Sequence, residues 1–221
     1  MLGIIFTGGE GPQAQIAKRL TEIRTEDALF FAADSGFDAA QRAGIKPNLI
    51  VGDMDSLKAI SSLDSCQVQN IIRYPHDKDF TDTELAFSAA VEKGCERIWI
   101  IGGGGGRIDH LFGIRSMFER DIFPLRWITS AEDIHCIAES TGEMGYKQES
   151  ALCCNLEIGA CVSVFPLGDG PWEAESSGLK WPLAGLSWNR GFFGLSNVAV
   201  DGKISITAIK GRFMVILPLT T

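Results

Sequence analysis

An apolar run that ends in two acids decides the fold class of this chain: Leu49-Ile50-Val51-Gly52-Asp53-Met54-Asp55-Ser56. The run has the composition of a buried strand in an α/β sheet. If the backbone stays extended from Gly52 to Asp55, the carboxylates of Asp53 and Asp55 point to the same side. Two such charges are costly unless a cation lies between them, and Mg²⁺ prefers oxygen ligands of this kind. The stretch predicts a metal site or, as the simpler alternative, a polar turn in which Asp55 or Ser56 caps the next helix.

Strand and helix patterns alternate along the first part of the chain, to about residue 138. Apolar runs predict strands, and apolar residues at helical spacing predict helices. The predicted strands are 2–7, 28–33, 49–51, 68–74, 97–101, 125–129 and 134–138, and the predicted helices are 13–23, 37–43, 82–93 and one beginning near 107–110. Successive β-α-β units of this length indicate an α/β fold with a mainly parallel, doubly wound sheet and helices on both faces.

The pattern changes after residue 139, where helical periodicity disappears. Short predicted strands alternate with Gly, Pro, Asn and Asp: 162–165, 172–176, 192–193, 197–200, 204–208 and 213–217. The pair Asp201-Gly202, between two of them, predicts a hairpin. We expect an α/β domain over residues 1–140 and a C-terminal all-β sandwich over residues 141–221.

Composition and charge exclude several classes of protein. The 221 residues are 45% hydrophobic with a formal net charge of −8, and no run of Lys or Arg stands out. This balance argues against a nucleic-acid or membrane-surface partner. We see neither signal-peptide features nor an apolar run long enough to span a bilayer, so we expect a cytoplasmic protein. The six cysteines lack metal-ligand spacing, so zinc is not expected, and settings such as Ala151-Leu152-Cys153-Cys154 predict buried, reduced thiols.

Acidic residues follow the predicted strands at the edge where ligands bind in a doubly wound sheet. Asp34, Asp53 and Asp55 end two strands, and Asp79 and Asp82 lie in the next loop. The strand 97–101 runs into five glycines, Gly102 to Gly106, which Arg107, Asp109 and His110 follow. Together these residues predict a binding site for a nucleotide polyphosphate. The acids would hold Mg²⁺, the glycine amides would approach phosphate oxygens, and the arginine would neutralise phosphate charge.

Several of these residues have simpler structural readings. Thr81-Asp82-Thr83-Glu84 matches a capping box, which would leave Glu84 with a purely structural role. Asp34 and Ser35 are residue types that cap a helix, so they could simply cap the one that follows. His110 could simply lie on the exposed surface of a helix. The glycines are also compatible with a mobile turn, although five in a row leave little side chain to obstruct a ligand.

Two common phosphate-binding motifs fit poorly. The P-loop pattern is absent, because Arg107 and Ile108 follow Gly106. The segment Gly9-Glu10-Gly11-Pro12-Gln13-Ala14 nominally fits a dinucleotide fingerprint and suggests an NAD(P)-dependent oxidoreductase as the rival function. Pro12 removes an amide where that fingerprint supplies one, and the paired acids stay unexplained.

Five segments together carry a resemblance to a known family. They are Ala33-Asp34-Ser35-Gly36, Gly52-Asp53-Met54-Asp55-Ser56, Lys78-Asp79-Phe80-Thr81-Asp82-Thr83-Glu84-Leu85-Ala86, Gly105-Gly106-Arg107-Ile108-Asp109-His110, and Ser177-Gly178-Leu179-Lys180-Trp181-Pro182-Leu183 with Gly194-Leu195-Ser196-Asn197. In this order they resemble the thiamine pyrophosphokinase (thiamine diphosphokinase) family over nearly the whole chain. Ser35 departs from the family's usual glycine, and the run Gly102–Gly106 is richer in glycine than usual.

The resemblance implies an N-terminal α/β domain, a C-terminal β-sandwich and transfer of pyrophosphate from ATP to the hydroxyl of thiamine, with Mg²⁺ and release of AMP. It also implies a homodimer in which thiamine binds between the catalytic domain of one subunit and the sandwich of the other. A non-enzymatic nucleotide or thiamine sensor is a further alternative, against which the full set of acids argues.

Roles for single residues follow from the resemblance together with the chemistry of the side chains. Asp53 and Asp55 would hold Mg²⁺, with Asp82 or Asp79 completing the site. The ATP-binding residues would be Asp34, Lys78, Gly103, Gly104, Gly105, Gly106, Arg107 and His110. Asp79 or Asp109 would orient the thiamine hydroxyl or accept its proton. Ser196 and Asn197 would bind the aminopyrimidine, and Trp181 would form an aromatic wall or else serve in core or interface packing.

Overall fold

The computed structural model describes residues 1–22, 28–53, 70–75, 77, 79–140 and 148–219. The lysine at position 78 and the aspartate at position 55 lie outside these ranges. The chain forms two compact units, Met1–Met117 with Trp127–Ser130, and Phe118–Arg126 with Ala131–Thr221. No helix among the described residues is long and apolar enough to cross a membrane.

The first unit is built on a parallel sheet in the strand order β6-β5-β1-β2-β3-β4. The strands are β1 (Leu2–Phe6), β2 (Ala28–Ala33), β3 (Leu49–Gly52), β4 (Ile71–Arg73), β5 (Arg97–Ile101) and β6 (Arg126–Ile128). β1 pairs in parallel with β2 and β5, and β3 pairs in parallel with β2 and β4. Every residue of β1 and β3 is buried, as expected for central strands covered on both faces. The predicted α/β class is confirmed.

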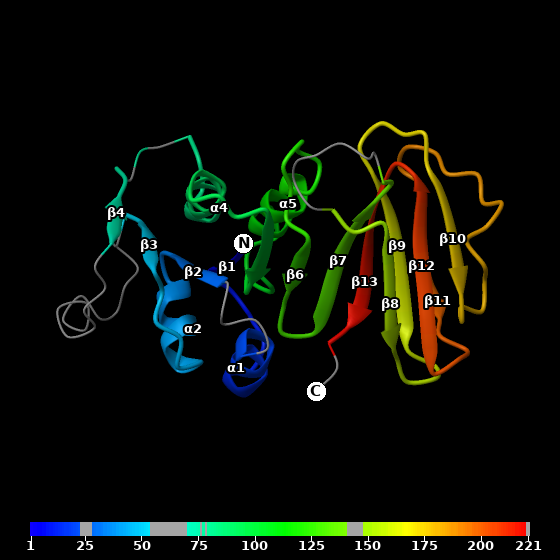
Figure 1. Cartoon of the computed structure of the whole chain (residues 1–221), viewed down its shortest axis with the longest axis horizontal. Coiled ribbons are helices and arrows are strands. Elements are labelled where there is room, and N and C mark those ends of the chain that lie inside the picture. The colour runs from blue at the N-terminus through cyan, green and yellow to red at the C-terminus, as the bar shows by residue number, and fades with distance from the viewer. Residues whose placement is uncertain (23–27, 54–69, 76, 78, 141–147, 220–221) are drawn as a thin grey trace. The chain divides into compact units, whose positions relative to one another are not determined.

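The helices in the described residues that connect these strands are α1 (Ala14–Glu22), α2 (Gly36–Arg42), α4 (Asp82–Glu92) and α5 (Ile108–Met117). Figure 1 shows α2 and α4 on opposite sides of the strands β1 to β3. α2 reaches the sheet only because position 36 is glycine, since a Cβ there would lie 2.1 Å from the carbonyl oxygen of Phe6. The predicted capping box is confirmed at α4, where Thr81 and Glu84 satisfy each other's backbone N–H groups.

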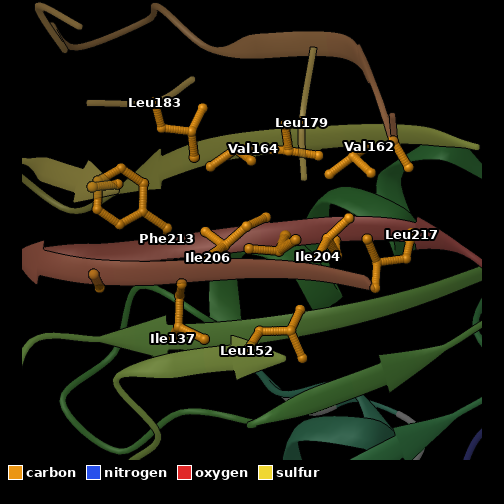
Figure 2. Close-up of a cluster of buried hydrophobic side chains, with 14 of the residues drawn as sticks. Ile137, Leu152, Val162, Val164, Leu179, Leu183, Ile204, Ile206, Phe213 and Leu217 are labelled. Carbon is orange, nitrogen blue, oxygen red and sulfur yellow. The ribbon is translucent and has the colours of Figure 1, made fainter. Parts of the chain in front are cut away.

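The second unit is a sandwich of two antiparallel sheets, as predicted. One sheet has the order β11-β9-β13-β7 and the other β10-β12-β8. Their strands are β7 (Glu132–Ala138), β8 (Ala151–Asn155), β9 (Cys161–Leu167), β10 (Glu173–Ser177), β11 (Gly194–Val198), β12 (Lys203–Lys210) and β13 (Arg212–Pro218). Figure 2 shows how Val164 of β9, Phe213 of β13 and Ile206 of β12 gather into one apolar core.

The boundary between the units lies earlier in the chain than residue 140. β7 belongs to the second unit because it pairs along its whole length with β13, from Arg212↔Ala138 to Pro218↔Glu132. Sequence alone grouped this strand with the first half, since its apolar run follows another strand of the same kind.

Three details of the second half were predicted wrongly. Asp201-Gly202 does not close a hairpin, because β11 pairs with β9 whereas β12 pairs with β10 and β8. Residues 192–193 precede β11 and form no strand. β8 was missed because only Leu152 of its five residues is buried, and the same edge position leaves Cys153 exposed although a buried thiol was expected.

Candidate active site

A pocket of about 690 Å³ opens at the carboxyl ends of β1, β2, β3 and β5. Loops after these strands, the start of α4 and one side of α5 form its walls. The lining residues are Thr7, Gly8, Gly9, Ala33, Asp34, Ser35, Asp53, Phe80, Thr81, Asp82, Thr83, Gly103, Gly104, Gly105, Gly106, Arg107, Asp109, His110, Gly113 and Ile114. The pocket therefore lies where an open parallel sheet binds its ligands.

Asp34 and Asp53 enter the pocket from adjacent strands. Ala33 pairs with Val51 in the parallel ladder, so the residues that follow each of them leave the sheet side by side. The Asp34 N–H donates to the carbonyl of Val51 at 2.9 Å, and Asp34 adopts a left-handed backbone with φ 45°. Ser35 occupies the N-cap position of α2, but its side chain makes no capping hydrogen bond. The loop after β2 thus shapes the pocket wall without a side-chain cap from Ser35.

Asp82 and Asp109 complete the acids that line the pocket in the described part of the chain. Asp82 is the first residue of α4, directly after the capping box. Asp79 is exposed and is not among the described lining residues. The structure thus brings Asp34, Asp53, Asp82 and Asp109 to one pocket.

Arg107 and Asp109 form a two-pronged ion pair at the pocket rim. The Arg107 Nε donates to Asp109 Oδ1 at 3.1 Å, and Nη2 donates to Oδ2 at 2.5 Å. The hydrogen bond from Arg107 lowers the pKa of Asp109 below its ordinary value, and the same bond raises the pKa of Arg107. A carboxylate with a lowered pKa is a poor proton acceptor, so this geometry favours a role for Asp109 in orienting the guanidinium.

The glycine loop, residues 102–106, is held partly by backbone hydrogen bonds. The Gly103 N–H donates to Gly8 at 2.7 Å, while Gly104 and Glu10 exchange two N–H···O bonds of 2.6 and 2.8 Å. Within the described residues, only the N–H groups of Gly105 and Gly106 in the segment 103–106 have no protein partner. The prediction of phosphate-binding amides therefore narrows to Gly105 and Gly106.

The same contacts explain why glycine is needed at several of these positions. A Cβ on Gly102 would lie 2.4 Å from the carbonyl oxygen of Thr7, and a Cβ on Gly104 would lie 2.7 Å from the carbonyl oxygen of Glu10. They also argue against the dinucleotide alternative. The Glu10 N–H, which a dinucleotide fingerprint would offer to a phosphate, already donates to Gly104.

Ten lining residues had no predicted site role. Three of them, Ala33, Ser35 and Thr81, are sequence neighbours of predicted residues, and the other seven fall into two groups. Thr7, Gly8 and Gly9 follow β1 just as the acids follow β2 and β3, so the rule that located the acids applies to them as well. The others come from helices or their approaches: Phe80, Thr83, Gly113 and Ile114. Helical spacing from His110 predicts Gly113 and Ile114, whereas no sequence signal distinguishes Phe80 and Thr83.

Three of the predicted thiamine-binding residues, Trp181, Ser196 and Asn197, lie in the second unit, whereas Asp109 lies in the first. The side chain of Asn197 is buried and accepts the Trp181 N–H at 3.1 Å, while its Nδ2 donates to the Trp181 carbonyl at 2.7 Å. Trp181 itself is 53% exposed, with Lys180 Nζ 4.6 Å from the ring centroid. Ser196 has φ 57° and donates its N–H to Ser163 Oγ at 3.2 Å. Asn197 therefore fixes the backbone of Trp181, and the ring is not part of the core of this unit.

The donor chemistry of the pocket fits a hard divalent cation. Its described acids supply carboxylate oxygens, and none of the described cysteines lines it. No group of three His, Cys, Asp or Glu within the described ranges is arranged to hold a metal by itself. Mg²⁺ typically takes one or two carboxylates and completes its shell with water and substrate phosphates, which this donor set allows.

Comparison with known proteins supports one family. A family model for the catalytic domain of thiamin pyrophosphokinase matches residues 20–121. The chain is 26% identical over 205 residues to thiamine pyrophosphokinase of Bacillus subtilis, covering 89% of this chain and 90% of that protein. It is 27% identical over 192 residues to thiamine pyrophosphokinase 2 of Arabidopsis thaliana, covering 83% and 69%.

Solved structures agree on the fold. The crystal structure of the Bacillus subtilis enzyme superposes with a TM-score of 0.73 at 24% identity, over 100% of this chain and 99% of that one. Thiamin pyrophosphokinase from Candida albicans superposes with a TM-score of 0.69 at 13% identity, over 99% and 90%. The family model, the curated relatives and the solved structures all point to the thiamine pyrophosphokinase family.

Proposed function

We propose that the chain transfers a pyrophosphoryl group from ATP to the hydroxyl oxygen of thiamine, giving thiamine diphosphate and AMP. The observation that carries the proposal is the meeting of Asp34, Asp53 and Asp82 with Arg107 and a glycine loop in one pocket. The similarity to thiamine pyrophosphokinases suggests the substrates, and the pocket has the charges that a nucleotide polyphosphate needs.

The pocket residues have separate tasks in this proposal. Asp53 and Asp82 would hold Mg²⁺ together with Asp55, which lies outside the described residues. When bound, the ion would neutralise charge on the transferred phosphates. Arg107, held by Asp109, and the N–H groups of Gly105 and Gly106 would bind phosphate oxygens.

The transfer itself forms a bond from the thiamine oxygen to the β-phosphorus and breaks the bond between that phosphorus and the oxygen of the α-phosphate. The hydroxyl proton leaves to a carboxylate or to water. Asp79 or Asp109 would orient this hydroxyl, and the lowered pKa of Asp109 makes Asp109 the poorer acceptor of the proton.

The second unit would provide the thiamine site of a homodimer. Trp181 offers an exposed ring to the cationic thiazolium or the pyrimidine, and its backbone is fixed by Asn197. Ser196 lies beside Asn197 and would hydrogen-bond the aminopyrimidine. The protein would act in the cytoplasm, where exposed thiols such as Cys153 and Cys161 stay reduced.

One incubation tests the reaction. Purified protein is mixed with ATP, Mg²⁺ and thiamine, and the nucleotide and thiamine products are separated by chromatography. Equal amounts of AMP and thiamine diphosphate are expected, with no product when the metal is chelated. Release of ADP, or no thiamine diphosphate under these conditions, would contradict the proposed function.

A further inference from the structure

Two threonines far apart in the sequence share a hydrogen bond inside the pocket. Thr7 Oγ1 lies 2.6 Å from Thr83 Oγ1. Thr7 directly follows β1, and Thr83 lies in the first turn of α4. Both residues line the pocket, yet they are only 6% and 8% exposed. We call this pair the threonine dyad.

The dyad has one more hydrogen than its single bond uses. Each hydroxyl carries one hydrogen and two lone pairs, so a bond between them consumes one hydrogen and leaves the other. Among the described residues, neither Thr7 nor Thr83 has any other hydrogen-bonding partner for its side chain. A buried donor without an acceptor is costly, and the pocket is the space from which an acceptor can reach it.

The surroundings favour an anionic acceptor. Thr7 lies next to the glycine loop, since a Cβ added to Gly103 would come within 3.3 Å of its Cγ2. Thr83 belongs to the N-terminal turn of an 11-residue helix, where partial positive charge collects. The dyad thus lies between the loop that carries the amides of Gly105 and Gly106 and the positive end of α4.

We propose that the threonine dyad donates a hydrogen bond to a phosphate oxygen of the bound nucleotide polyphosphate. This assignment rests on the proposed function for the identity of the nucleotide, and it adds two residues to the binding site. Whichever hydroxyl accepts within the dyad donates its own hydrogen to the phosphate.

Three variants separate this role from simple packing: Thr7→Val, Thr83→Val and the double variant. Valine keeps the shape of threonine without the hydroxyl. Each single variant leaves a buried hydroxyl without its partner and should unfold at lower urea, whereas the double variant should have stability close to that of the unaltered protein. Binding of ATP with Mg²⁺, measured by calorimetry without thiamine, should be about tenfold weaker in the double variant, because a hydrogen bond to a charged group is lost.

Two controls sharpen the measurement. Adenosine has no phosphate, so its affinity should be the same for the double variant and the unaltered protein. Thr83→Ser keeps the hydroxyl and should retain both stability and ATP affinity. The single variant that binds ATP as weakly as the double variant identifies the hydroxyl that faces the phosphate.

The outcomes distinguish the dyad from the overall reaction. If the double variant is stable and binds ATP within twofold of the unaltered protein, the dyad is structural and the proposal fails. If the unaltered protein binds ATP but forms no thiamine diphosphate, the proposed function fails while the tenfold loss still supports the dyad. An unaltered protein that binds neither ATP nor inorganic pyrophosphate with Mg²⁺ overturns both.

Discussion

Asp34 and Asp53 illustrate how single residues can be costly for the fold and useful for a ligand. They leave neighbouring parallel strands, and a Cβ on Gly52 would lie only 3.3 Å from the Cα of Asp34. Asp34 also takes a left-handed backbone, which costs a non-glycine residue free energy. Like charges and strain at one place persist when something else at the site compensates for them, and a bound cation is the simplest compensation.

The metal assignment is tested by Asp53→Asn. The amide keeps the size of the side chain but removes a negative charge, so binding of Mg²⁺ should weaken and turnover should fall by about 100-fold or more. Urea unfolding should be little changed, because relief of like-charge repulsion offsets any lost contact. Initial rates at several Mg²⁺ concentrations provide the measurement. A variant with near-normal turnover at low Mg²⁺ would rule out Asp53 as a ligand.

The ion pair at the pocket rim makes a second prediction for a single residue. Because the hydrogen bond from Arg107 lowers the pKa of Asp109, Arg107→Ala should raise that pKa toward its ordinary value. Carboxyl chemical shifts of Asp109, followed by NMR during a pH titration, report this directly. Arg107→Lys is the matched control, since it keeps the charge but loses the two-pronged geometry. An unchanged Asp109 titration in the alanine variant would show that the pair does not form in solution.

At the scale of elements, local features of this site were predictable and long-range ones were not. Thr81 and Glu84 are three residues apart, so the sequence alone predicted the capping box that begins α4. The contacts of the glycine loop could not be predicted in the same way. Its bridge from Gly104 to Glu10 joins segments that only the folded sheet brings together. Five glycines suggested an open phosphate loop, whereas two of them, Gly102 and Gly104, are needed for close backbone contact.

Gly113 allows a test of how an element balances stability against binding. It lies inside α5 and lines the pocket, and a Cβ there would meet nothing within 4 Å. Gly113→Ala should therefore stabilise the protein by about 0.5–1 kcal/mol through helix propensity. The added methyl group takes space from the pocket, so ATP affinity should fall. Urea unfolding and calorimetry are the two measurements, and higher stability with unchanged affinity would place the nucleotide away from α5.

A buried ion pair between Arg126 and Asp133, both in the second unit, makes the stability of that unit depend on pH. Burial alone would raise the pKa of Asp133, but hydrogen bonds from His135 and the two-pronged contact of Arg126, at 2.7 and 2.6 Å, hold it well below its ordinary value. Because the pKa is lower in the folded state than in the unfolded state, the contribution to stability is complete above about pH 4 and is lost as the pH falls below it.

Asp133→Asn tests this linkage. At neutral pH the variant should lose about 3 kcal/mol or more of unfolding free energy, since Arg126 is left buried without its carboxylate. The difference from the unaltered protein should shrink between about pH 4 and pH 2, because protonation removes the same interaction from Asp133. Urea unfolding at a series of pH values measures it. A difference that does not vary with pH would mean that the ion pair contributes little.

At the scale of the whole molecule, the order of elements was the most predictable property. Alternating strands and helices dictated a parallel sheet, and the switch to short strands dictated a sandwich. The details that failed depend on which sheet each strand joins. Strands β11 and β12 are neighbours in sequence but belong to different sheets. The hairpin predicted from Asp201-Gly202 therefore does not form.

The connection from β10 to β11 exposes an unusual number of large apolar side chains. They are Trp181, Leu186, Phe192 and Phe193, and Leu195 of β11 is exposed beside them in the sequence. Such a concentration typically marks a surface that binds another molecule. It agrees with the proposed homodimer, in which this region would help to form the thiamine site of the partner subunit.

Mixing two inactive variants tests that arrangement. Asp53→Asn damages the catalytic unit, and Trp181→Ala damages the proposed thiamine site. Co-expressed with different tags, they form mixed dimers with one intact site if each site draws on both subunits. Random pairing should then restore about a quarter of the normal activity. Asp53→Asn co-expressed with Asp82→Asn is the matched control, because both changes damage the same unit and no intact site can form. If the first pair recovers no more activity than this control, each site lies within a single chain.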